Sequence, residues 1–212
     1  MYLSRLALNM DNLNARRALA DPYRMHQLVW SGFPQIQRQD RNEPSGILFR
    51  VEPIVQENPI VVLVQSAIRP DWRPLLGEGV VLSSKHAEYS PAFTSGQTLR
   101  FRLRANPTAR RKLNEDGSPL GKRVGLFGEE KQRAWFERKA GDGGFELVEY
   151  RISRSGNLDS KKPENKEIRH LGVDFDGILR VTNSEQFEMT VTGGVGAGKG
   201  FGFGLLSIAP VR

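Results

Sequence analysis

Apolar and polar positions along the chain predict the same order of elements twice. In the first half, alternating or continuous apolar residues predict strands at 3–9, 47–51 and 60–65, with a helix at 21–33 between the first two. The weaker patterns DWRPLL and GVVLSS predict a helical turn and a last short strand. The first half therefore runs strand, helix, strand, strand, helix, strand.

The polar stretch KHAEYSPAFTSGQ at 85–97 is the predicted linker, and the same order of elements follows it. Strands are predicted in TLRFRLRA, FELVEYRI, LGVDFDGILRV and GLLSIAP, and helices in EEKQRAWFERKAG and SEQFEMTV. Gly177 is a predicted bend and Ser184 a predicted N-cap. We therefore predict an α+β protein with two tandem ferredoxin-like (βαββαβ) domains and antiparallel sheets, at 1–90 and 97–212.

The composition narrows the classes of protein. With 38% hydrophobic and 26% charged residues, the chain is typical of soluble globular proteins. The lack of cysteine excludes disulfides and a cysteine nucleophile, and three scattered histidines do not favour a metal site, so we expect neither metal nor cofactor. No basic leader precedes an apolar run and no stretch approaches ~18 apolar residues, so we expect a cytoplasmic protein. The net charge of +7 favours an anionic partner.

Basic side chains are concentrated in and after the strand predicted in TLRFRLRA. Six of them, with no acidic residue between, are Arg100, Arg102, Arg104, Arg110, Arg111 and Lys112. The first three alternate with apolar residues and so share one strand face at roughly 6.6 Å spacing, close to that of successive phosphates. A solvated sheet face explains this alternation equally well, but the uninterrupted continuation favours RNA or DNA.

A second basic segment, YRISRSGNLDSKKPENKEIRH, is predicted as a long, mobile hairpin between two strands. It contains Arg151, Arg154, Lys161 and Lys162. Acidic residues dilute its charge, so a solvated flexible loop is the simpler interpretation on composition. A hairpin arm that becomes ordered on RNA is the alternative.

The glycine run GGVGAGKGFGFGLLS partly matches the Walker pattern, which requires Ser or Thr after the lysine. Gly200 occupies that position and too little chain follows for a P-loop domain, so nucleotide hydrolysis is not favoured. A tight connection between helix and strand does not require so many glycines. Backbone N–H groups around Gly196, Gly198 and Lys199 can instead hold an anion or allow an RNA backbone to approach.

The helix at 21–33 has a well-marked start, because Asp21 suits an N-cap and Pro22 the first helical position. Its apolar stripe is formed by Met25, Leu28, Val29 and Phe33. Tyr23, His26 and Trp30 fall on an adjacent flank, where phenol and imidazole reach the same small volume. Such a pair is most often a boundary contact. Near neutrality, however, an imidazole can act as general acid or base, which suffices to cleave RNA when the substrate's 2′-OH is the nucleophile.

Four further polar residues carry no chemistry that the sequence indicates. His86 and His170 are predicted on the surface. Asp174 and Asp176 lie on one face of a predicted strand, but no third metal ligand is evident, so we predict a surface pair.

Five segments together resemble the CasE family, the CRISPR-associated endoribonucleases of the type I-E Cascade complex within the RAMP superfamily. They are MYLSRLALN, YRMHQLVW, FRLRANPTARR, GKRVGLF followed by AWFERK, and GVGAGKGFGFGLLSIAP. The motifs occur in the family's order and cover nearly the whole chain. The resemblance implies two ferredoxin-like domains, an RNA partner in the stem-loop of the CRISPR repeat, and further partners in other Cascade subunits.

The resemblance also implies a reaction. The family cleaves precursor CRISPR RNA at the 3′ base of the stem without metal, leaves a 5′-OH and a 2′,3′-cyclic phosphate, and stays on its product. Its histidine falls on His26 and its tyrosine on Tyr23, while Lys122 and Arg123 of GKRVGLF join the expected RNA-binding residues. Some relatives place a lysine shortly after the histidine, where this chain has Trp30 and Ser31. The charge that stabilises the phosphate is therefore open among Arg154, Lys161 and Lys199.

Two other classes compete with the nuclease. A non-catalytic RNA-binding RAMP subunit would share the sheets, the basic face and the glycine loop. A DNA-binding regulator fits less well, because no helix-turn-helix is evident in the sequence.

Overall fold

The first half of the protein forms one antiparallel sheet with helices. The computed structural model describes residues 1–36, 46–53, 59–113, 119–161 and 167–211. The strands β1 (Tyr2–Leu8), β2 (Leu48–Val51), β3 (Val61–Ser66) and β4 (Val81–Glu88) pair in the order β2-β3-β1-β4. The helices are α1 (Leu13–Ala20), α2 (Pro22–Trp30) and α3 (Arg73–Gly77).

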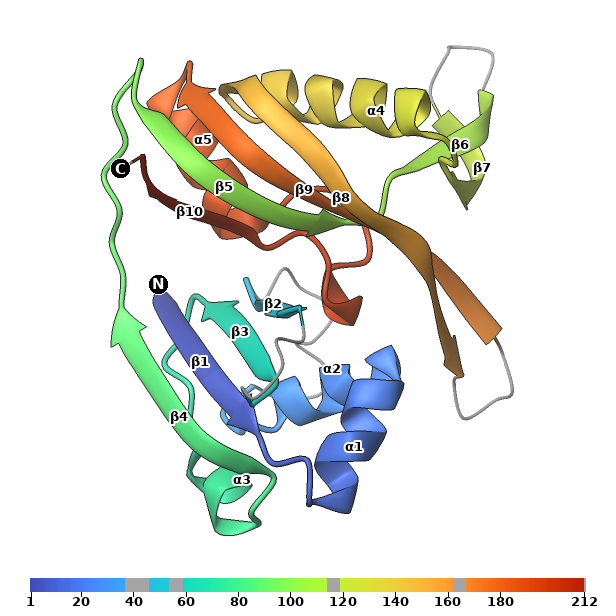
Figure 1. The fold of residues 1–212 in the computed structure, drawn as a ribbon. Coiled ribbons are helices and arrows are strands. Elements are labelled where there is room, and N and C mark those ends of the chain that lie inside the picture. Colours follow the sequence, from blue (N-terminus) through green and yellow to red (C-terminus); the bar gives the residue numbers. More distant parts are fainter. Residues whose placement is uncertain (37–45, 54–58, 114–118, 162–166, 212) are drawn as a thin grey trace.

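The second half repeats this arrangement. Its sheet has the order β10-β5-β9-β8 and is formed by β5 (Thr98–Ala105), β8 (Phe145–Lys161), β9 (Glu167–Val181) and β10 (Leu206–Pro210). The helices α4 (Glu129–Asp142) and α5 (Ser184–Gly193) cover one face, and Figure 1 shows this unit above the first. Both halves follow βαββαβ with corresponding strand order, which confirms the predicted ferredoxin-like folds. The boundaries at 1–90 and 97–212 stay a prediction.

Each sheet has its own hydrophobic core. The predicted stripe is buried in the first core: Met25, Leu28 and Val29 lie on α2, as expected for an amphipathic helix, and Phe33 follows the end of the helix at Trp30. In the second core, Leu99, Phe101 and Leu103 of β5 pack with the aromatic residues of α4. The alternation in TLRFRLRA therefore buries one face of β5, as predicted.

Several predicted strand boundaries were wrong, because polar segments beside the predicted strands also pair in the β-sheets. Residues Lys85–Glu88 of the predicted linker belong to β4 and pair with β1. Within the segment 150–170, predicted as a long, mobile hairpin, residues 150–161 and 167–170 extend β8 and β9 as paired strands. Backbone pairing satisfies N–H and C=O groups whatever the side chains are, so hydrophobic alternation underestimates such strands.

Other elements were not predicted at all. Helix α1 and the hairpin of β6 (Thr108–Leu113) and β7 (Pro119–Gly125) lie in stretches without a clear apolar period. The N-cap of α5 is Asn183, whose side chain accepts from the N–H of Gln186, so the prediction of Ser184 was wrong by one residue. Gly177, the predicted bend, pairs with Tyr150 beside a bulge in β8.

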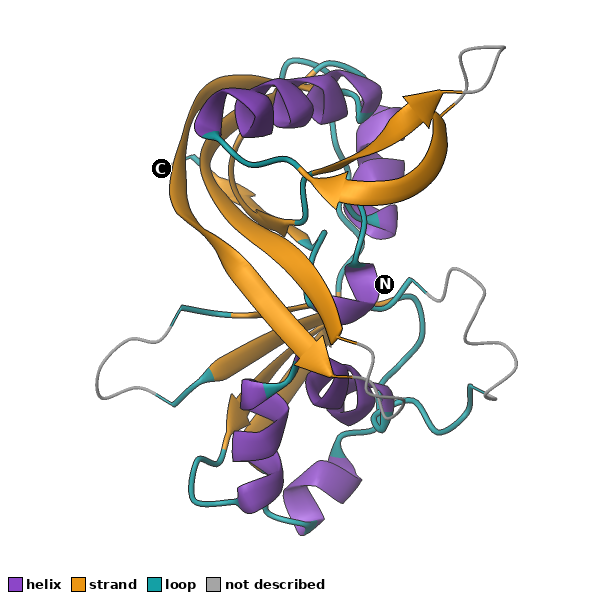
Figure 2. Ribbon diagram, turned by 90° about the vertical axis from the view of Figure 1, so that its right-hand side faces the viewer, coloured by secondary structure: helices purple, strands orange, loops and turns teal. Residues whose placement is uncertain are grey.

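The long β8–β9 hairpin joins the two halves in space. It runs from the second sheet toward the helices of the first half, as both ribbon views show (Figures 1 and 2), and β8 contacts α2. Among the described helices, none has the length and apolar character needed to cross a membrane.

Candidate functional site

The start of α2 positions the two candidate catalytic side chains. Asp21 caps the helix, with its carboxylate accepting a hydrogen bond from the N–H of Tyr23 at 2.9 Å, and Pro22 occupies the first turn. The predicted helix start is therefore confirmed. Tyr23 and His26 are half-buried on the flank beside the buried stripe, whereas Trp30, placed on the same flank, is buried.

The glycine-rich loop from the other half of the protein packs against His26. The loop joins α5 to β10 and includes the short 3-10 helix η2 (Lys199–Phe201), which contacts α2. A Cβ added to Gly200 would lie 3.3 Å from Nδ1 of His26. The Phe201 ring also stacks on the imidazole, with the ring centroids 6.4 Å apart. Two motifs that the sequence offered separately thus form one site.

Backbone conformation explains two glycines of this loop. Gly198 and Gly202 flank η2 with φ angles of 79° and 85°, in the left-handed region that residues with a side chain rarely adopt. A Cβ at Gly198 would also lie 3.0 Å from the Phe203 ring, and one at Gly196 would lie 2.9 Å from Trp135. Close packing therefore explains Gly196 and Gly198 within the protein itself, whatever they contribute to RNA binding.

A pocket of about 440 Å³ opens beside this contact. His26 and Trp30 of α2 line one side, and Lys199 and Gly200 of the glycine-rich loop line another. Burial lowers the pKa of the half-buried Lys199, and the nearby charge of Lys139 lowers it further. The pocket therefore places an imidazole and a half-buried ammonium around one small volume.

His170 lies next to this site, so its prediction as a surface residue was wrong. Its ring packs against that of Phe201 in a tilted arrangement, with the centroids 4.5 Å apart, and its Nδ1 lies 3.2 Å from the amide nitrogen of Asn106. Burial lowers the pKa of His170. The extension of β9 beyond its predicted start carries the residue under the loop. His86 is exposed on β4, as predicted.

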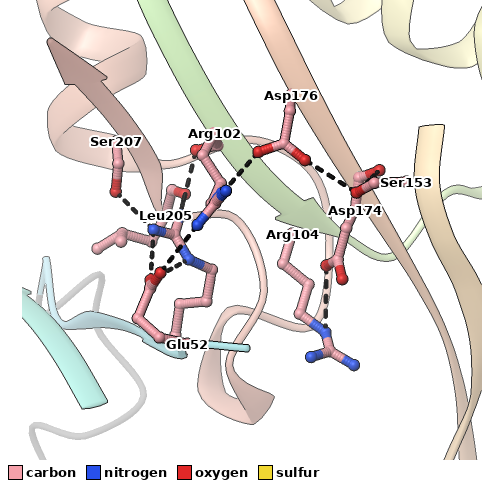
Figure 3. Close-up of polar contacts among 9 residues, drawn as sticks. Glu52, Arg102, Arg104, Ser153, Asp174, Asp176, Leu205 and Ser207 are labelled. Atoms are coloured by element: carbon pink, nitrogen blue, oxygen red, sulfur yellow. Dashed lines mark hydrogen bonds and ion pairs between the residues drawn. The ribbon is translucent and has the colours of Figure 1, made fainter. Parts of the chain in front are cut away.

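The predicted arginine stripe lies on the face of β5 that points toward the first half of the protein. Its charge is partly neutralised there, because Arg102 binds Asp176 at 2.6 Å and Glu52 at 3.2 Å (Figure 3). Arg104 lies 3.6 Å from Asp174. Asp174 and Asp176 are therefore largely buried partners of the stripe rather than the predicted surface pair.

The buried Arg50 extends this network across the two sheets. From β2, its guanidinium donates to the main-chain oxygens of Arg102 and Leu205 and to the hydroxyl of Ser207. The guanidinium also forms an ion pair with Glu52, at 2.6 Å. Arg50 was not predicted as a functional or structural residue, since neighbouring residues in an apolar strand do not indicate that its arginine forms a buried ion pair.

A second pocket, of about 540 Å³, lies over this network between the two halves. Arg102, Arg104 and Arg151 contribute to its lining from β5 and β8. Arg151 is exposed, and so is Arg100 near the start of β5. The structure thus brings these predicted RNA-binding residues to one side of the second sheet.

The remaining predicted RNA-binding residues lie elsewhere. Arg110 and Arg123 are exposed, pair across β6 and β7, and sit at the far end of the second unit from α2 (Figure 1). The side chains of five others, and all of Lys162, fall outside the described residues: Arg111, Lys112, Lys122, Arg154 and Lys161. The described structure therefore does not unite the whole predicted set in one surface.

Comparisons with known proteins give one consistent result. The model of the family described as CRISPR associated protein matches residues 1–210. The chain is 37% identical to the CRISPR-associated endoribonuclease Cse3 of Thermus thermophilus, covering 99% of this chain and 100% of the relative. It is 31% identical to the CRISPR system Cascade subunit CasE of Escherichia coli K12, covering 100% of both chains.

Solved structures agree with these relatives. A structure of the CRISPR endoribonuclease Cse3 bound to a 19-nucleotide RNA superimposes with a TM-score of 0.85 at 36% identity, covering 99% of this chain and 100% of that one. Thermus thermophilus Cse3 bound to an RNA representing a pre-cleavage complex gives a TM-score of 0.83 at 38% identity, with 99% and 98% covered.

Proposed function

Since the chain belongs to the CasE family of CRISPR-associated proteins, we propose that it is the endoribonuclease that processes precursor CRISPR RNA. It binds the stem-loop of the CRISPR repeat and cuts at the 3′ base of the stem without metal. It then stays on the product and joins the other subunits of Cascade in the cytoplasm, where the transcript is made.

The observation that carries this proposal is the contact between α2 and the glycine-rich loop. The loop packs on His26 through Gly200 and Phe201, so the imidazole is held at the edge of a pocket that two separate units of the fold enclose. A general acid or base must be held in place to act, and a side chain on a free helix flank would not be.

The reaction follows from the groups at this position. The 2′-oxygen of the nucleotide before the cut attacks the adjacent phosphorus, the bond from phosphorus to the 5′-oxygen breaks, and a cyclic phosphate and a 5′-OH result. One proton leaves the 2′-OH and one reaches the 5′-oxygen. Tyr23 and His26 serve these two ends, which are on opposite sides of the phosphorus in an in-line displacement.

Binding of the RNA stem is assigned to the basic face of the second sheet, which lines the second pocket through Arg102, Arg104 and Arg151. Arg100 of β5 and Arg151 of β8 are exposed there, and the β8–β9 hairpin continues from this face to α2. Phosphate contacts of this kind give affinity and register, and they leave the position of the cut to the site at His26.

The test uses a labelled repeat hairpin with excess EDTA. A single cut at the 3′ base of the stem is expected, and a 2′-deoxy substitution before the cut should abolish cleavage while binding remains. His26→Ala should lower the single-turnover rate constant at least ~10²-fold, the usual scale for general acid–base catalysis. His86→Ala, which removes an exposed imidazole from β4, is the matched control and should leave the rate unchanged.

Three results would count against the proposal. Binding without any cut would support a non-catalytic RNA-binding subunit instead. Loss of RNA binding to competing duplex DNA would point to a DNA-binding regulator. Cleavage of the 2′-deoxy substrate would exclude the attack by the 2′-OH.

A further inference from the structure

The pocket beside His26 has a markedly uneven charge distribution. Among the described residues that line it, Lys199 is the one lysine or arginine, and no aspartate or glutamate is present. The N-terminal ammonium of Met1, which also lines the pocket, donates to the main-chain oxygen of Tyr89 at 3.3 Å. Lys199 is therefore the side-chain ammonium that this pocket offers to a ligand.

The loop places Lys199 next to the residue that contacts the imidazole. Lys199 precedes Gly200, whose backbone packs on His26, and both Lys199 and His26 line the pocket. The stem of Lys199 lies over the backbone of Gly204, where an added Cβ would come within 3.3 Å of its Cγ. A side chain packed in this way loses little further freedom when it binds an anion.

The surroundings of Lys199 favour an anion rather than an empty site. Burial and the charge of Lys139 both lower its pKa, and no carboxylate among the described residues offsets them. Lys139 itself is paired with Asp142 at 3.3 Å and does not line the pocket. A bound phosphate would relieve both effects on Lys199.

The reaction needs such a cation at this place. As the 2′-oxygen adds to phosphorus, negative charge accumulates on the two non-bridging oxygens, and the groups that move protons at the ends do not neutralise it. A half-buried ammonium stabilises this charge, and a lysine suits it as a compact point charge.

We propose that Lys199 is a catalytic residue whose ammonium binds the non-bridging oxygens of the scissile phosphate and stabilises them in the transition state. The proposal rests on the proposed function, since it takes His26 as the group that acts on the same phosphate. It assigns the stabilising charge to the glycine-rich loop of the second unit, opposite the helix that carries the imidazole.

The test compares three variants in single-turnover cleavage at saturating enzyme. Lys199→Met keeps the aliphatic stem and should lower the rate constant about 10²- to 10³-fold, the scale for removing one donor to a developing oxyanion. Lys199→Arg keeps the charge and should recover at least about tenfold of that loss. Lys131→Met removes an exposed lysine of α4 that does not line the pocket, and its rate should stay within about threefold of wild type.

Affinity for the uncleavable 2′-deoxy hairpin separates catalysis from binding. Lys199→Met should weaken this affinity less than about tenfold, because a single phosphate contact is lost. A Lys199→Met protein that cleaves within about threefold of wild type would overturn the proposal. So would a variant that loses affinity while its saturated rate constant is unchanged.

Failure of this proposal is distinguishable from failure of the proposed function. If His26→Ala is inactive and Lys199→Met cleaves normally, only the role of Lys199 is wrong. If the wild-type protein and His26→Ala behave alike, the assignment of the site itself is wrong. The unfolding midpoint of each variant, measured by circular dichroism, shows whether the fold is intact. Added methylammonium should partly restore the cleavage rate of Lys199→Met only if the missing group in the pocket is an ammonium.

Discussion

Replacing Arg50 by Met tests whether the joint between the two sheets depends on one buried guanidinium. The side chain of Arg50 is 4% exposed and reaches from β2 to the second sheet. Its Nη1 donates to the main-chain oxygens of Arg102 at 3.1 Å and Leu205 at 3.2 Å, and its Nη2 donates to Ser207 at 3.0 Å. Burial lowers the pKa of Arg50, and Glu52 opposes this shift most strongly.

The expected loss follows from what the substitution leaves behind. Met fills most of the space, so the cavity is small, but two carbonyls lose donors and Glu52 loses its nearer cation. Removing one partner of a buried ion pair costs about 3–5 kcal/mol. Glu52 keeps Arg102 at 3.2 Å, which moderates its share of the loss. We therefore expect the free energy of unfolding to fall by about 3–5 kcal/mol.

Urea unfolding followed by tryptophan fluorescence measures this change. Trp30 and Trp72 report on the first core and Trp135 on the second, so both halves are observed. Arg138→Met is the matched control, because Arg138 pairs with Asp142 on the surface with 58% of its side chain exposed, and such pairs contribute roughly 0–1 kcal/mol. A loss below about 1 kcal/mol for Arg50→Met would refute the reasoning, since the buried partners would then have found water or other donors.

Three further predictions address the site and its surroundings. Gly200→Ala should lower the cleavage rate constant about tenfold without changing affinity, because the new Cβ meets His26. Gly77→Ala is the control, because it has open space around it and does not line the pocket, and equal rates for the two variants would contradict the packing argument. In salt titrations of RNA binding, Arg100→Ala should reduce the slope of log affinity against log salt by about one phosphate contact. Arg102→Ala should reduce the slope by less, because the charge of Arg102 is already paired with carboxylates. The reverse order would show that RNA displaces these carboxylates from Arg102. The pKa of His170 is below its usual 6.5 in the folded protein, so the unfolded chain takes up the proton first and the free energy of unfolding falls as the pH drops below about 6.5. His170→Phe should therefore lose less unfolding free energy than the wild-type protein between pH 7.5 and 5.5. An equal loss in the two proteins would show that His170 is not a cause of the pH dependence.

Local chemistry explains which parts of the fold and site were predictable. The start of α2 depends on Asp21 and Pro22 alone, and its stripe repeats with the period of a helix, so both could be inferred from neighbouring residues. The alternation of β5 likewise gives its two faces. Patterns of this kind depend on residues a few positions apart in the sequence, and the local features predicted from them were correct.

Contacts between distant residues set the rest. Alternation places Arg102 and Arg104 on one face but does not show what covers them. In the sheet, they lie directly opposite Asp176 and Asp174 of β9, and this register cannot be inferred from either strand by itself. The contact of Gly200 with His26 has the same origin, because it depends on how two separately folded sheets meet.

The two halves share a path for the backbone but differ at one connection, and this difference creates the site. In the first half, α3 ends at Gly77 and β4 begins at Val81, so the connection is short. In the second half, the corresponding connection runs from the end of α5 at Gly193 to the start of β10 at Leu206. The extra length lets the loop leave its own sheet and pack on α2 of the other half. His26 and Lys199 therefore belong to different units, and neither unit contains both sides of the pocket. Docking of the two sheets through Arg50 is then a condition for the chemistry as well as for stability, because it fixes the strand that follows the loop.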